Sequence, residues 1–233
     1  GLGDVYKRQW QRQEKLWPTA WEGGFSMRPE TSSSAPRHGG MMAAFHEEKK
    51  REVEALRNMM EAGKLPAPLP GPRPSFSAAL LAPHEGTLPV IAEYKRASPS
   101  RGDIRLDLLP EDIAARYARA GAACLSVLTE KAFFKGDMSF LGRMAPAGLP
   151  LLRKDFILDP LQVRATAATP ASALLLIVRL TPDVRLLRDL REEAERFGME
   201  AVTEIFNEQD LNLARESGAR IIQVNARDLD SLH

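Results

Sequence analysis

From residue 88 onward, short apolar segments alternate with longer segments in which apolar residues recur at helical spacing. Short apolar runs are typical of strands buried on both faces, and apolar residues three and four positions apart are typical of helices that cover a sheet. Gly121, Gly198 and Gly218 each follow a helical segment, where glycine favours the end of a helix. The pattern predicts strands at 88–96, 124–129, 149–154, 173–180, 201–206 and 220–225, and helices at 109–120, 138–144, 160–168, 182–197 and 209–217.

Alternation of strand and helix predicts an α/β fold made of right-handed parallel βαβ units. A closed (β/α)8 TIM barrel needs eight units of about 30 residues each. Residues 88–233 hold about six of them. We therefore expect a partial (β/α)8 barrel, truncated at its carboxyl end, whose open sheet exposes two strand edges.

An N-terminal helical extension is predicted for residues 41–87. Residues 47–62 carry apolar side chains at helical spacing on a charged background, and a proline-rich connector at 65–74 follows. The simplest interpretation is a surface helix packed on the barrel.

Residues 1–40 do not resemble the start of a domain. Their three tryptophans have no regular spacing, and a run rich in serine, proline and glycine follows them. Such a composition buries little apolar surface, so we expect disorder. Our hypothesis is that this segment is non-native, with the natural start at Met41 or Met42.

Composition mainly excludes classes of function. The 32 basic and 31 acidic residues leave a net charge of +1, so nothing demands a nucleic acid or an anionic membrane as partner. Cys124 is the only cysteine, which agrees with a reducing, cytoplasmic compartment. The longest apolar run, 173–178, is far below the roughly 18 residues that span a bilayer. The four histidines form no spaced pair at strand ends, which argues against a metal site or a Ser-His-Asp triad.

Polar residues gather where the predicted strands end. In a (β/α)8 barrel the catalytic groups project from the carboxyl ends of the strands. Alternation along the first strand puts Glu93 and Lys95 on the inward face, where charges are costly unless they pair or function. The polar residues at this end are, in chain order, Glu93, Lys95, Lys154, Glu204, Asn225 and Arg227.

Each of these residues also has a purely structural interpretation. A lysine at a strand end is usually a solvated rim residue, Glu204 can form an ion pair with Lys154 or Arg227, and Asn225 can cap a turn. All of them fall at the same end of successive strands, and this coincidence favours a catalytic site.

Several of these segments resemble the family of indole-3-glycerol-phosphate synthases. Residues 90–102, VIAEYKRASPSRG, match the family's first barrel strand and loop, close to I-A-E-[FIY]-K-R-x-S-P-S-x-G. Further similarity lies in LSVLTE and FFKG at 125–136, LRKDFI at 152–157, LLLI at 174–177 and NARDL at 225–229. The resemblance covers most of residues 76–229 and also implies that the N-terminal extension lies near the mouth of the barrel.

The resemblance implies a decarboxylating carbon-carbon lyase of tryptophan biosynthesis. Its substrate, 1-(o-carboxyphenylamino)-1-deoxyribulose 5-phosphate, is a phosphorylated small molecule that loses carbon dioxide and water as the pyrrole ring closes. No metal or organic cofactor is implied. Lys154 would donate a proton to the ribulose carbonyl, and Glu93, Lys95 and Glu204 would carry the dehydration, with their individual roles left open. The implied substrate-binding residues are Ser98, Phe134, Phe156, Leu175, Asn225 and Arg227.

Departures from the family pattern keep other functions open. TPASA at 169–173 stands where the family usually has G-A-D-A, and Phe206 stands where histidine is common. The family holds the phosphate largely in loops after strands seven and eight, so we expect this polypeptide alone to be inactive. One alternative is a non-catalytic relative that acts as a binding or assembly partner, and another is a phosphate-binding barrel isomerase. Fusion or association with another enzyme of the tryptophan pathway is also possible from the sequence.

Overall fold

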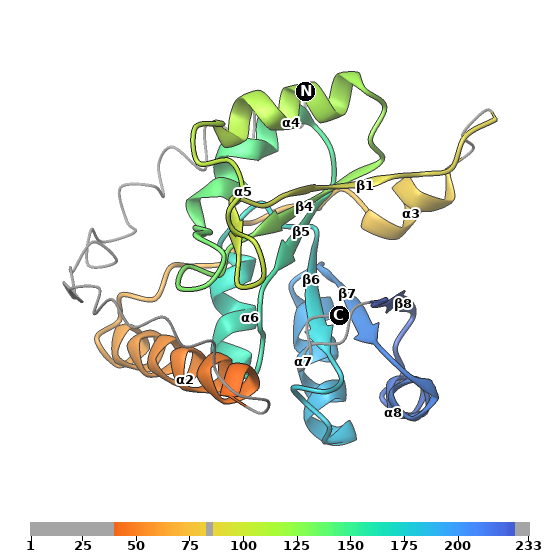
Figure 1. Cartoon of the computed structure of the whole chain (residues 1–233). Helices are drawn as coiled ribbons and strands as arrows, with labels where there is room; N and C mark the ends of the chain where they lie inside the picture. Colours follow the sequence, from red (N-terminus) through yellow and green to blue (C-terminus); the bar gives the residue numbers. More distant parts are fainter. Residues whose placement is uncertain (1–39, 83–85, 227–233) are drawn as a thin grey trace.

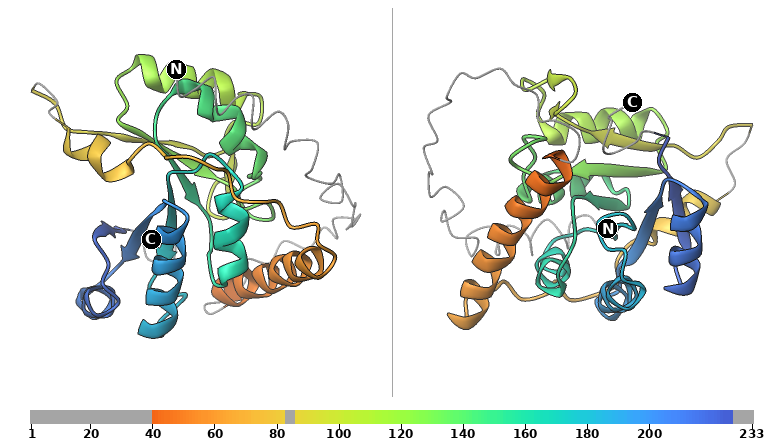
Figure 2. Two further views of the ribbon diagram at one scale, coloured as in Figure 1. Left: turned by 180° about the vertical axis from the view of Figure 1, so that it is seen from behind. Right: turned by 60° about the horizontal axis from the view of Figure 1, so that its bottom comes forward.

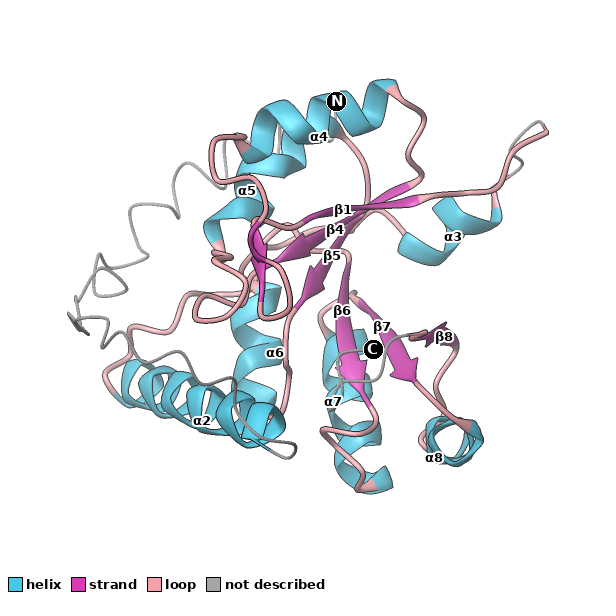
Figure 3. Cartoon of the chain, viewed as in Figure 1, coloured by secondary structure: helices cyan, strands magenta, loops and turns pink. Residues whose placement is uncertain are grey.

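Parallel strands form one curved sheet in the computed structural model, which describes residues 40–82 and 86–226 (Figure 1). Within those ranges the sheet has six strands in the order β1-β4-β5-β6-β7-β8. Helices follow the strands in turn and lie on the outer face of the sheet (Figure 3). The strands are β1 (Ile91–Tyr94), β4 (Cys124–Leu128), β5 (Leu151–Lys154), β6 (Ala173–Ile177), β7 (Glu200–Ile205) and β8 (Ile221–Val224). The connecting helices are α4 (Pro110–Arg119), α5 (Ser139–Met144) with its 3-10 extension η2 (Ala145–Ala147), α6 (Pro160–Ala167), α7 (Val184–Arg196) and α8 (Glu208–Glu216).

This arrangement confirms the predicted partial (β/α)8 barrel. Every neighbouring pair in the main sheet is parallel, as βαβ units require. The edge strands of the described sheet are β1 and β8, where open edges were expected. The predictions for residues 1–39 and for Arg227 lie outside the described residues.

Local sequence signals set the ends of the helices. Asp183 accepts a hydrogen bond from the backbone N–H of Arg185 at 2.8 Å and so caps α7, which begins at Val184, two residues after the predicted start at 182. The apolar stripe of α7, which includes Leu187 and Leu190, is buried against the sheet. The helix ends before Gly198, whose φ of 69° is costly for other residues.

Alternation along the strands builds two layers of core. The inward layer contains Cys124, Leu152, Leu175 and Val202 in one apolar cluster. The outward layer, which includes Leu174 and Leu176, packs against α6, α7 and α8 in a second cluster. Because side chains point to opposite faces in turn, one strand such as β6 supplies both layers.

The N-terminal extension is longer and more deeply packed than predicted. Helix α2 (Gly40–Glu61) begins seven residues before the predicted start at 47, and its Phe45 joins the inward core. Helix α3 (Phe76–Leu81), which the sequence did not indicate as an element, buries Phe76 in the same cluster. Figure 2 shows α2 running beside α6, where Leu56 packs on Leu161. Helix α2 is therefore part of the barrel's core as well as of its surface.

Two predictions near the first strand were wrong in detail. Strand β1 begins at Ile91 rather than at 88, because Leu88 and Val90 lie at the edge of the sheet and are 85% and 55% exposed. The segment after β1 was predicted as a loop, but it contains a small antiparallel hairpin of β2 (Ala97–Ser98) and β3 (Gly102–Asp103). In the part of the chain that the structure describes, no helix is long and apolar enough to cross a membrane.

Candidate active site

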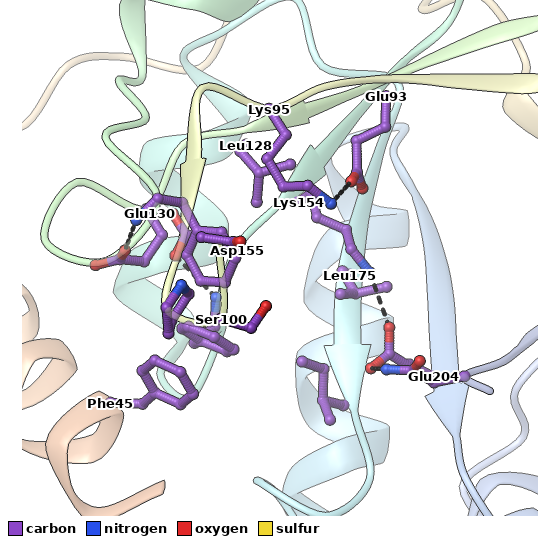
Figure 4. A pocket seen from close by; sticks show the side chains of 16 residues that line it. Phe45, Glu93, Lys95, Ser100, Leu128, Glu130, Lys154, Asp155, Leu175 and Glu204 are labelled. Atoms are coloured by element: carbon purple, nitrogen blue, oxygen red, sulfur yellow. Dashed lines mark hydrogen bonds and ion pairs between the residues drawn. The ribbon is translucent and has the colours of Figure 1, made fainter. Parts of the chain in front are cut away.

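A pocket of about 330 Å³ opens at the carboxyl ends of the strands (Figure 4). It is bounded by the ends of β1, β4, β5, β6 and β7, by the loop within the β2–β3 hairpin and by the start of α2. Every predicted site residue that the structure describes lines it, whereas Arg227 lies outside the described residues. These residues are Glu93, Lys95, Ser98, Phe134, Lys154, Phe156, Leu175, Glu204 and Asn225.

The first strand contributes an ion pair on the rim of the pocket. Lys95 donates from Nζ to Glu93 Oε1 at 2.6 Å, and both side chains are about one-third exposed. The Ser126 hydroxyl donates to the other oxygen of Glu93 at 3.4 Å. Because both members of the pair reach solvent, either can exchange its partner for a ligand.

A second, more buried pair crosses the pocket from β5 to β7. Lys154 Nζ lies 2.9 Å from Glu204 Oε2, and the lysine side chain is 21% exposed while the glutamate is 3% exposed. Glu204 also accepts hydrogen bonds from the amide groups of Gln223 and Asn225, each at 2.9 Å. The carboxylate is thus held by three donors, and Figure 4 shows the ammonium of Lys154 directed at Glu204 within the pocket.

This ion pair is the one that the structural interpretation of Glu204 anticipated. Geometry therefore shows that Lys154 and Glu204 are paired in the empty pocket, and pairing by itself is compatible with either interpretation. Gln223 was missed by the sequence analysis, although alternation along β8 places it on the same face as Asn225.

Aromatic side chains form the opposite wall. Phe156 stacks on Phe45 with ring centroids 4.2 Å apart and an interplanar angle of 26°, and it lies 6.1 Å from Phe134. Phe133 meets Phe45 edge to face at 4.9 Å. Phe45 was missed because polar residues follow it, yet it stands eight residues before Val53, which is a helical spacing. With Leu175, these rings give the pocket a flat apolar surface.

A buried network of charges anchors α2 beside this wall. Lys49 of α2 lies 2.6 Å from Asp155 Oδ1, and both side chains are almost fully buried. Arg153 pairs with the other oxygen of Asp155 at 2.9 Å and with Glu52 of α2 at 3.0 Å. The Thr129 hydroxyl also donates to Asp155. The network therefore ties α2 to the ends of β4 and β5 and holds Phe45 on Phe156.

Opposite charges keep this network ionised. Burial by itself raises the pKa of the Asp155 carboxyl, but the adjacent Lys49 and Arg153 outweigh it and hold that pKa below its usual range. Burial likewise opposes the charge of Lys49, yet Asp155 and Glu52 raise the pKa of Lys49 above its ordinary value. Neither Asp155 nor Lys49 was predicted at the site, since alternation along β5 points Asp155 away from Lys154.

The pocket suits an organic anion with an aromatic part. Within residues 40–82 and 86–226, no group of three histidine, cysteine or acidic side chains is placed to hold a metal ion. The site instead combines two lysine-glutamate pairs with an aromatic wall. Such a set can bind an anion, stack against a ring and move protons at a reacting atom.

Comparison with known proteins identifies the family. The family model for indole-3-glycerol phosphate synthase matches residues 42–233. The indole-3-glycerol phosphate synthase of Chlorobium phaeovibrioides is 42% identical over 193 residues, which cover 81% of this chain and 73% of that protein. This chain belongs to the indole-3-glycerol phosphate synthase family. The enzyme of the same name from Chloroherpeton thalassium is 45% identical over 78% of this chain and 72% of its own length, and that from Desulfosudis oleivorans is 47% identical over 62% and 55%.

The alignments thus span between 55% and 73% of the lengths of these relatives of the family. Among solved structures, a xylose isomerase-like TIM barrel protein from Mycobacterium smegmatis aligns with a TM-score of 0.38 at 13% identity, over 63% of this chain and 66% of that one. That likeness is too low to support any statement about the site.

The two departures from the family pattern lie outside the pocket lining. Residues 169–172 precede β6 at the opposite end of the sheet, where the Arg73 guanidinium donates to the carbonyls of Thr169 and Ala171 at 2.6 and 2.5 Å. Phe206 follows β7 and is 37% exposed, with the Arg179 guanidinium 4.0 Å from the centre of its ring. Neither departure changes a residue that the pocket presents to a ligand.

Proposed function

We propose that this protein is an indole-3-glycerol-phosphate synthase, which converts 1-(o-carboxyphenylamino)-1-deoxyribulose 5-phosphate into indole-3-glycerol phosphate. The observation that carries the proposal is the position of Lys154, which lines the pocket at the carboxyl ends of the strands and whose ammonium pairs with Glu204 at 2.9 Å (Figure 4). Family membership supports a decarboxylating lyase acting on a phosphorylated small molecule.

Ring closure requires a proton donor at the ribulose carbonyl. The electron-rich aryl carbon that bears the carboxylate attacks the carbonyl carbon, and the carbonyl oxygen gains a proton as the new bond forms. Lys154 supplies this proton in our proposal, because its Nζ is exposed to the pocket and Glu204 orients it. Loss of carbon dioxide then restores the aromatic ring.

The final dehydration needs an acid and a base on either side of the new ring. Glu204 and the Glu93–Lys95 pair are the groups available, since they flank the open space from β7 and β1. Lys95 can also neutralise the substrate carboxylate or phosphate. We assign the dehydration to these three residues together.

The remaining residues would bind and orient the substrate. Phe156, Phe134 and Leu175 are proposed to hold the aryl ring, and Ser98 lies on the hairpin beside Lys95. Asn225 reaches the pocket from the end of β8 and contacts Glu204. Arg227 is proposed for the substrate carboxylate on the strength of the family motif alone.

A steady-state assay for indole-3-glycerol phosphate tests the proposal. It is run on this 233-residue chain and on an extended chain, in which the part of the Chlorobium phaeovibrioides relative that its alignment leaves uncovered is joined to this sequence. We expect product from the extended chain. A folded extended chain that binds the substrate but makes no product would contradict the proposal and favour the non-catalytic assembly role. Family membership argues against an isomerase, while association with other tryptophan-pathway enzymes stays a prediction.

Gln223 offers a test of how Glu204 is held. Gln223→Leu keeps most of the side-chain volume but removes the amide that donates to Glu204. Hydrogen bonds to charged groups contribute about 1.5–3 kcal/mol, so we expect kcat/KM of the extended chain to fall roughly tenfold or more. Ile222→Leu, on the other face of β8, is the control, and an equal loss in both variants would refute a specific effect on Glu204.

A further inference from the structure

Glu130 is a buried acidic residue that lines the pocket and that has no role in the proposed chemistry. It lies two residues past the end of β4 and is 1% exposed. Figure 4 shows its carboxylate turned back toward the backbone of the loop that follows it. A buried carboxylate is costly unless its oxygens are satisfied, so its partners show what it does.

The partners of Glu130 are successive backbone groups of one loop. Its carboxylate accepts hydrogen bonds from the N–H groups of Ala132, Phe133 and Phe134 at 2.9, 2.7 and 3.1 Å. Its own carbonyl accepts from the N–H of Gly136 at 2.8 Å. One residue thus closes the loop at 131–136 from both its side chain and its main chain.

The loop has little freedom to adopt another shape. A Cβ added at Gly136 would lie 2.5 Å from the Leu128 carbonyl oxygen and 2.7 Å from that of Glu130. Lys135 has a φ of 51°, a left-handed conformation that is uncommon for a residue other than glycine. Such a conformation persists only where the surroundings hold it in place. The hydrogen bonds to Glu130 are part of these surroundings.

Two rings of the aromatic wall stand on this loop. Phe134 lines the pocket beside Phe156, and Phe133 packs edge to face against Phe45. Both of their N–H groups are bound by Glu130, so the position of the rings depends on the carboxylate. The wall therefore rests on two supports, the Lys49–Asp155 network under Phe45 and Glu130 under Phe133 and Phe134.

The charges around Glu130 agree with a structural use of its carboxylate. Burial raises the pKa of the Glu130 carboxyl, and the loop N–H groups and Lys49 oppose this effect. Asp155, from the end of β5, acts in the same direction as burial. The Glu130 carboxylate is thus held mainly by hydrogen bonds from backbone N–H groups rather than by a salt bridge.

We propose that Glu130 is a positioning residue that folds the loop at 131–136 and so sets the aryl-binding wall of the pocket. The inference rests on the proposed function for the identity of the ligand. Glu130 touches the backbone of the loop, and it acts on the substrate only through Phe133 and Phe134.

The test compares Glu130→Ala and Glu130→Gln with a matched control in the extended chain. Glu200→Gln is that control, because the Glu200 carboxylate also accepts backbone N–H groups, from Phe76 and Ser77, but at the start of β7, away from the pocket. The probe is the substrate analogue whose ketone has been reduced to an alcohol, which keeps the aryl ring and phosphate but cannot cyclise. Its Kd is measured by calorimetry, alongside KM and kcat.

We expect Glu130→Ala to weaken analogue binding and raise KM about tenfold, with kcat within about threefold of that of the unsubstituted chain. The reason is that the aromatic wall binds the aryl ring equally well in the substrate and in the transition state. Glu130→Gln keeps one oxygen that can accept hydrogen bonds from the loop, so its affinity for the analogue should fall less than that of Glu130→Ala. Glu200→Gln should leave Kd and KM unchanged. In addition, 4-fluorophenylalanine at position 134 should shift its fluorine NMR signal toward that of the unfolded chain in Glu130→Ala only.

Specific outcomes overturn the inference. An unchanged Kd and fluorine signal in a folded Glu130→Ala would show that the loop does not depend on Glu130. An equal loss in Glu200→Gln would show only general destabilisation. If the extended chain without substitutions binds the analogue but makes no product, the proposed function is refuted, and the Kd values alone then decide whether Glu130 positions the loop. If that chain does not bind the analogue, both the proposed function and the role of Glu130 are refuted.

Discussion

Lys154→Ala in the extended chain is expected to lower kcat by about 10²- to 10⁴-fold, the range for removal of a positioned general acid. The ammonium of Lys154 pairs with Glu204 inside the pocket, and alanine leaves no proton donor at that place for the ribulose carbonyl. Binding of the reduced analogue should change far less, since the wall stays intact. Steady-state kinetics and calorimetry measure the two quantities.

Lys50→Ala is the matched control for the loss of a lysine. Lys50 is 71% exposed on α2 and pairs with Glu47 at the solvent-exposed surface, so its removal should leave kcat unchanged. A kcat of Lys154→Ala within tenfold of the parent, with the protein folded, would contradict the assignment of Lys154 as proton donor.

Asp155→Asn is expected to cost about 3–5 kcal/mol of folding free energy, because breaking a buried ion pair leaves its partners uncompensated. The variant removes the carboxylate that Lys49 and Arg153 share, and their side chains are 3% and 1% exposed, so Glu52 alone is left to balance two buried cations. Chemical denaturation at pH 7 measures the loss. Glu47→Gln, which breaks an exposed pair on the same helix, should leave the folding free energy nearly unchanged.

The stability difference between the parent and Asp155→Asn depends on pH because folding lowers the pKa of Asp155. The folded-state pKa of Asp155 is held below its unfolded value of about 3.9. The stabilisation is therefore fully present above the unfolded pKa and is lost as pH falls through the folded pKa. The gap in stability between parent and Asp155→Asn should narrow below about pH 4. A gap that stays constant down to pH 3 would show that Asp155 acts by shape alone.

Alternation along strands accounts for much of what the sequence could predict at the site. The period of two places Glu93, Lys154 and Glu204 inward, and parallel strands bring their carboxyl ends to one mouth. The order of strands and helices followed from hydrophobic pattern and glycine positions in the same way. Periodicity is a local signal, so it succeeds wherever regular structure continues.

Residues beyond the regular elements could not be found by that signal. Asp155 stands one position past β5, and its parity is opposite to that of Lys154, so alternation directs it away from the predicted site. Glu130 acts through the backbone of its own loop, and no side-chain pattern reports such contacts. Phe45 lies more than a hundred residues from Phe156, and only tertiary packing brings the two rings together. These three residues required the structure.

The buried network that anchors α2 has a consequence for the order of folding. Arg153 and Glu52 are 101 residues apart in the chain, and Asp155 and Thr129 come from two different strands. Helix α2 can dock only after β4 and β5 have paired, since its binding partners do not exist before then. Local unfolding should follow the opposite order to folding, so amide hydrogens of α2 should exchange with solvent before those of the central strands. Phe45 leaves the pocket with the helix, and the aryl site is lost while most of the barrel is still folded.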